Sequence, residues 1–162
     1  MASHPAKIGM VGFSAGAMLT LTTELSGGDA KPAFIGIIYG PLSAVEVPAD
    51  APPMFVALAA DDPFSGGGDF GLINSWRAAK KPVEFHLFEQ GGHGFGMYQK
   101  PTTSTGWFDE LTRWLAMHGW VGGVFQTVTH VWIGPATYVK RISPASYHVM
   151  KSPAECRDRI HS

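Results

Sequence analysis

The amino-acid sequence predicts an α/β fold, in which a parallel sheet is flanked by helices. Apolar segments of strand length alternate with helix-forming segments through roughly the first 120 residues. Several of these apolar segments show no polar alternation, which is typical of strands buried on both faces of a parallel sheet. A Gly-x-Ser-x-Gly pattern also stands where the first strand would turn into the first helix.

The first half of the predicted fold comes from two strands and one helix. Residues 7–13 form an apolar run of strand length, and residues 15–25 are good helix formers that end before Gly27. Residues 34–40 read as a second buried strand. The segment 41–53 contains four prolines and no helical period, so we expect an irregular crossover there.

The second half continues the alternation. Residues 54–60 form a continuous apolar strand, residues 70–80 a helix, and residues 83–89 a further strand. A last helix is predicted over 105–118, because its large apolar residues recur on one helical face. That face consists of Trp107, Phe108, Leu111, Trp114 and Leu115. We interpret it as a core stripe.

The character of the chain changes after His118. Residues 1–118 carry 7 Lys+Arg against 11 Asp+Glu, a net −4, whereas residues 119–162 carry 5 against 2, a net +3. We therefore expect one domain over 1–121 and a distinct C-terminal extension over 122–162. Residues 124–133 have high strand propensity, and the prolines after Gly134 predict loosely ordered chain. The basic and aromatic side chains of this extension are interpreted as solvated tail.

The Gly12-Phe13-Ser14-Ala15-Gly16 segment predicts an activated serine. A tight turn between strand and helix leaves no room for a Cβ at either glycine and presents the Ser14 hydroxyl to solvent. The backbone N–H of Ala15, at the N-terminus of the helix, would then face an oxyanion formed on a substrate. This segment supplies a candidate nucleophile and half of an oxyanion hole.

Two carboxylates follow the strand predicted at 54–60. Asp61 and Asp62 precede Pro63, which cannot continue a central strand. Their side chains are thus delivered to the same sheet edge as Ser14. Either could orient an imidazole, and either could instead cap the loop.

A histidine follows the next strand. His93 lies in the segment Gly91-Gly92-His93-Gly94-Phe95-Gly96, where four glycines would let the ring approach a neighbouring strand end. The order Ser, Asp, His along the chain is the order that a serine nucleophile on such a turn requires. A plain flexible loop is the competing interpretation.

Composition excludes several other classes. The net charge is −1 without a basic run, which argues against nucleic-acid binding, and no apolar stretch has the length of a membrane span. No signal peptide is seen at the start of the chain, so we expect a cytoplasmic protein. The single cysteine, Cys156, and the absence of ligand spacing among the seven histidines argue against a disulfide and a metal site.

The three motifs together resemble those of the α/β-hydrolase fold family, specifically its acetyl esterase, xylan esterase and dienelactone-hydrolase-like branch. The resemblance covers about residues 7–121. It implies that Ser14 is the nucleophile, His93 the general base and Asp62, next to Pro63, the acid. It also implies a serine hydrolase acting on small carboxylic esters, acetylated carbohydrate among them, without a cofactor.

The chain also departs from that family. Only a few residues precede the serine motif, so the chain resembles the C-terminal half of such an enzyme, a partial α/β-hydrolase fold, and lacks the loop with the second oxyanion donor. A non-catalytic remnant that binds or assembles without turnover is therefore the alternative hypothesis. A strand edge left without its neighbours predicts self-association, with residues 124–133 as a partial cover.

Overall fold

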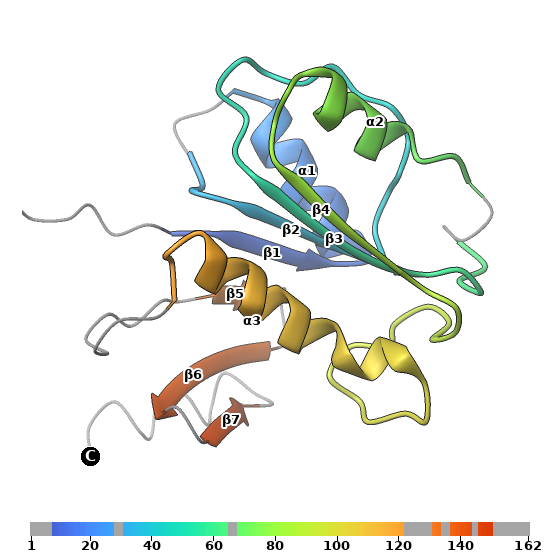
Figure 1. The fold of residues 1–162 in the computed structure, drawn as a ribbon, viewed down its shortest axis with the longest axis vertical. Coiled ribbons are helices and arrows are strands. Elements are labelled where there is room, and N and C mark those ends of the chain that lie inside the picture. Colours follow the sequence, from blue (N-terminus) through green and yellow to red (C-terminus); the bar gives the residue numbers. More distant parts are fainter. Residues whose placement is uncertain are drawn as a thin grey trace, which may run out of the picture.

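The computed structural model describes residues 8–27, 31–64, 68–121, 131–133, 137–143 and 146–150. Its centre is a sheet with the strand order β4-β3-β2-β1-β5-β6-β7 (Figure 1). Its first four strands are parallel to one another, and they are β1 (Met10–Phe13), β2 (Ile35–Ile38), β3 (Met54–Ala59) and β4 (Val83–Phe88). The predicted α/β class with a parallel sheet is confirmed.

Helices cover both faces of this parallel region. In Figure 1, α1 (Ala15–Leu25) and α2 (Gly71–Ala78) lie on one face, and α3 (Trp107–Met117) lies on the other. Every residue of β2 and β3 is buried, which accounts for their continuous apolar sequences. The parallel strands therefore lie between two helical layers, and their carboxyl ends share one edge of the sheet.

The apolar stripe of α3 packs into the core as predicted. Four of its five residues are buried, namely Trp107, Leu111, Trp114 and Leu115, and the fifth, Phe108, is partly buried against the core. The Trp114 ring meets the Phe34 ring edge-on, at a centroid distance of 5.8 Å. Burying a leucine side chain such as that of Leu111 contributes about 1.5–3 kcal/mol. The helix begins at Trp107 and not at residue 105, because a 3₁₀ turn over Thr103–Gly106 precedes it.

The strand predicted at 34–40 is shorter than expected. It ends at Ile38 because Tyr39 adopts φ 38°, in the left-handed region that no strand residue occupies. Residues 41–53 form no helix or strand, as their prolines predicted. None of the helices in the described part of the chain combines the length and the apolar character of a membrane span.

The C-terminal extension adds β5 (Val131–Ile133), β6 (Thr137–Ser143) and β7 (Ser146–Met150). β5 pairs parallel with the start of β1, through Met10↔Trp132 and Val11↔Ile133. Part of the predicted strand 124–133 thus covers the edge of β1, and residues 124–130 lie outside the described residues.

Our prediction of loosely ordered chain after Gly134 is wrong for β6 and β7. β6 pairs antiparallel with β5, and β7 pairs antiparallel with β6. The physical reason is that these segments are rich in β-branched and aromatic residues. Antiparallel neighbours also need only a short connection.

Candidate active site

Ser14 lies on the turn between β1 and α1, with φ 52° and ψ −117°. This conformation is sparsely populated for a residue with a side chain and costs about 1–3 kcal/mol. Backbone hydrogen bonds hold it: Ser14 N donates to Ile38 O at 3.0 Å, and its carbonyl accepts from Ala17 N at 3.0 Å and Met18 N at 3.1 Å. The serine is therefore held at the carboxyl edge of the sheet, at the start of a helix.

Gly12 makes this turn sterically possible. A Cβ on Gly12 would lie 2.1 Å from the Gly16 carbonyl oxygen and 2.5 Å from Thr20 Oγ1. Both distances are far inside van der Waals contact, so the strand end and the helix can approach this closely only without a side chain at residue 12.

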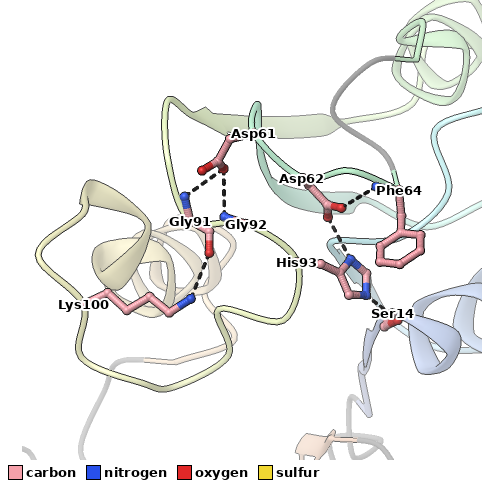
Figure 2. Close-up of polar contacts among 8 residues, drawn as sticks. All are labelled: Ser14, Asp61, Asp62, Phe64, Gly91, Gly92, His93 and Lys100. Carbon is pink, nitrogen blue, oxygen red and sulfur yellow. Dashed lines mark hydrogen bonds and ion pairs between the residues drawn. The ribbon is translucent and has the colours of Figure 1, made fainter.

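Three of the predicted side chains are joined by hydrogen bonds (Figure 2). Ser14 Oγ lies 2.8 Å from His93 Nε2, and His93 Nδ1 lies 2.9 Å from Asp62 Oδ2. An ionised carboxylate can only accept, which assigns the ring proton to Nδ1. Nε2 is then left as the acceptor for the Ser14 hydroxyl. The order of the strands explains the meeting, since Ser14 follows β1, Asp62 follows β3 and His93 follows β4.

The environment of Asp62 and His93 fixes both side chains. Asp62 is 2% exposed, and its Oδ1 accepts a hydrogen bond from the backbone N–H of Phe64 at 2.8 Å. The His93 ring meets the rings of Phe64 and Tyr39 edge-on, at centroid distances of 4.8 Å and 5.2 Å. The imidazole is thus oriented by one carboxylate and two aromatic contacts.

Asp61 has a different position from its neighbour. Its Oδ1 accepts hydrogen bonds from Gly91 N at 2.9 Å and Gly92 N at 2.7 Å, on the loop that leads to His93 (Figure 2). The two aspartates, which the residues alone left as alternatives, are therefore separated by the structure: Asp62 contacts the imidazole and Asp61 contacts the loop backbone.

Ala15 is the first residue of α1, and its N–H is among those that the helix leaves without an internal acceptor. Ala15 also lines an open cavity of about 610 Å³ beside Ser14. The cavity is lined by Ser14, Ala15, Met18, Tyr39, Gly40, Pro41, Leu42, Ser43, Phe64, Gly68, Asp69 and His93. Within the described ranges, no three His, Cys, Asp or Glu side chains gather as a metal site would require.

Tyr39 is one of the lining residues that sequence reasoning missed. It is 7% exposed, and burial raises the pKa of its phenol to about 12, although a hydrogen bond from the Gly96 backbone acts in the opposite direction. Its place directly after β2, between the strands that carry Ser14 and Asp62, is the signal that could have identified it.

Solved structures show the same fold. An α/β-hydrolase enzyme from a Medee basin deep-sea metagenome library is 29% identical, with a TM-score of 0.59 over 70% of this chain and 55% of that one. An acetyl ester-xyloside bifunctional hydrolase from Caldicellulosiruptor lactoaceticus is 21% identical, with a TM-score of 0.62 over 74% of this chain and 59% of that one. The carboxylesterase Cest-2923 from Lactobacillus plantarum is 19% identical, with a TM-score of 0.55 over 73% and 61%.

The chain spans less than two thirds of the length of each of these structures. A comparison with curated protein sequences finds no significant match. The family model of the dienelactone hydrolase family matches residues 1–122, a stretch that includes the serine turn, both aspartates and the histidine loop. With this match over most of its length, the chain belongs to the dienelactone hydrolase family.

Proposed function

We propose that this protein is a serine hydrolase that cleaves small carboxylic esters through an acyl-enzyme. The observation that carries the proposal is the continuous hydrogen-bonded chain from Ser14 through His93 to Asp62, with the serine on a strained turn. This arrangement of nucleophile, base and orienting acid is recognised by its geometry, whatever the fold around it. Membership of a hydrolase family supports the same reaction class.

Each contact has a role in the proposed reaction. Ser14 Oγ attacks the ester carbonyl while His93 Nε2 takes its proton, and Asp62 stabilises the imidazolium that forms. The N–H of Ala15 donates to the carbonyl oxygen as it becomes an oxyanion. The intermediate collapses as His93 returns the proton to the departing alcohol. Water, deprotonated by His93, then releases the acid and restores Ser14.

The cavity favours an uncharged ester. Its lining is largely apolar near Ser14, where Met18 and Phe64 are exposed. Asp69 is the only carboxylate among the lining residues, and no lysine or arginine joins it in the described part of the chain, so an anionic substrate would meet repulsion. The volume of about 610 Å³ exceeds what an acetyl group needs, which leaves room for a larger alcohol such as a sugar.

A fluorophosphonate probe tests the proposal directly, because it reacts with activated serines. We expect a label that maps to the peptide of Ser14 and that Ser14→Ala abolishes. Ser43→Ala is the matched control, since Ser43 lines the same cavity while the serine bonded to His93 is Ser14. Folded protein that takes no label at Ser14 would contradict the proposal.

That negative result would favour the alternative, a family member that binds or assembles without turnover. The proposed mechanism assigns one oxyanion donor, the N–H of Ala15 at the start of α1, and the lack of one such donor typically costs about a hundred- to thousandfold in rate. Measuring turnover also separates a hydrolase from a protein that only binds or assembles. For a hydrolase with this cavity, we expect hydrolysis of p-nitrophenyl acetate to exceed that of an otherwise similar ester whose acyl chain ends in a carboxylate.

A further inference from the structure

We propose that Asp61 is a positioning residue, which holds the loop that carries His93 through its role as a hydrogen-bond acceptor. The inference deepens the proposed function and rests on it for its catalytic consequence. The hydrogen bonds of Asp61 go to the backbone N–H groups of Gly91 and Gly92, the two residues before His93, and not to the imidazole.

The contacts of Asp61 converge on a single stretch of backbone. One carboxylate oxygen, Oδ1, accepts from the N–H groups of both Gly91 and Gly92. The Gly91 carbonyl accepts from Lys100 Nζ at 2.9 Å (Figure 2). The peptide unit between Gly91 and Gly92 is therefore held at both its ends, by Asp61 at the N–H and by Lys100 at the carbonyl.

This loop needs such an anchor because of its composition. Gly92, Gly94 and Gly96 all adopt positive φ, at 63°, 74° and 47°, and glycine loses more backbone freedom on ordering than any other residue. The root of the loop is also packed closely, since a Cβ on Gly91 would lie 2.7 Å from Ser104 Oγ. The hydrogen bonds to Asp61 thus fix the backbone at the start of this loop, and with it the direction in which His93 points.

The geometry indicates that the acceptor atom matters, and not the charge. Asp61 is exposed, and its bonded partners are neutral amides. An asparagine retains a side-chain oxygen at the same place and can accept both bonds. At Asp62 the opposite holds, because an amide there offers an N–H that competes with the Nδ1 proton and favours the wrong tautomer.

Asp61→Asn and Asp61→Ala therefore form a matched pair. We expect Asp61→Ala to lower kcat by about tenfold to a hundredfold with little change in KM, as a small displacement of a catalytic group does. We expect Asp61→Asn to retain a kcat near that of the unaltered protein. Lys100→Met, at an exposed position, should lower kcat in the same direction, and it supplies the test if Asp61→Ala does not fold.

Amide hydrogen exchange supplies a readout that does not depend on activity. In peptides that span residues 89–97, Asp61→Ala should accelerate exchange of the Gly91 and Gly92 amide protons, and Asp61→Asn should not. Unchanged protection in Asp61→Ala would overturn the proposal, and so would equal kcat losses in the alanine and asparagine variants. If the unaltered protein shows no turnover or labelling, the proposed function fails, while the exchange data still decide whether Asp61 holds the loop.

Discussion

Replacing Gly12 with alanine should damage both stability and activity, although the change adds a single methyl group. The new Cβ would meet the Gly16 carbonyl oxygen at 2.1 Å, the Gly16 carbonyl carbon at 2.3 Å and Thr20 Oγ1 at 2.5 Å. Two of these three atoms belong to the backbone of α1. No rotamer change can relieve those contacts, so the helix and the strand must move apart.

The size of that movement follows from the structure. A carbon–oxygen contact needs about 3.3 Å, so the separation at Gly16 must grow by roughly 1.2 Å from the 2.1 Å of the alanine geometry. Overpacking of this kind costs about 1–3 kcal/mol, which corresponds to a fall in Tm of about 2–12 °C for a chain of this size. A displacement near 1 Å between Ser14 and its partners costs about a hundredfold in rate.

Thermal unfolding and ester hydrolysis would be measured for Gly12→Ala beside Gly106→Ala. Gly106 is the matched control, because a Cβ there meets nothing within 4 Å and its φ of −81° suits any residue. Adding Thr20→Ala to Gly12→Ala should not restore activity, since the backbone contacts remain. A Gly12→Ala protein with unaltered Tm and kcat would refute the steric argument.

Three further predictions concern other parts of the molecule. Ser14→Ala and His93→Ala should each abolish esterase activity while the circular dichroism spectrum stays unchanged, and turnover in either variant would remove that residue from the mechanism. Burial raises the pKa of Tyr39 to about 12, against about 10 when unfolded. Its contribution to the unfolding free energy is therefore fully present below pH of about 10 and lost towards pH of about 12. Denaturant titrations of Tyr39→Phe should lose less stability over that interval than the unaltered protein, and an equal loss would contradict this cause. Removal of residues 124–162 should uncover the β1 edge and increase self-association in light scattering over a concentration series, whereas a monomer at every concentration would refute it.

Most of the parallel region could be predicted because its signals are local. The apolar run that becomes β3 starts at Met54 as predicted and ends one residue early, at Ala59. The helix after Ser14 spans Ala15–Leu25, as its helix-forming residues indicated. The meeting of Ser14, Asp62 and His93 was predictable too, because parallel strands deliver their carboxyl ends to one edge. The catalytic roles of these residues stay a prediction.

The remaining features depend on contacts that no local pattern encodes. Tyr39 ends β2 through a positive φ, and a tyrosine gives no sign of that conformation in the sequence. The separate partners of Asp61 and Asp62 follow from how the β4 loop returns past the end of β3, a distance of about thirty residues along the chain. The pairing of β5 with β1 joins segments more than a hundred residues apart. Strand propensity could therefore predict that β5 exists, but not which strand it pairs with.

Formation of the hydrogen bond between Ser14 and His93 reports on how far folding of the sheet has progressed. The two residues are 79 positions apart and follow β1 and β4, two parallel strands of the sheet that have β2 and β3 between them. Non-local pairings of this kind form late, because the chain entropy of closing them must be overcome first. The contact can arise only when all four strands have found their register. With Ser14 as the proposed nucleophile, the time at which a refolding chain first reacts with a serine-directed probe would therefore mark the assembly of these strands.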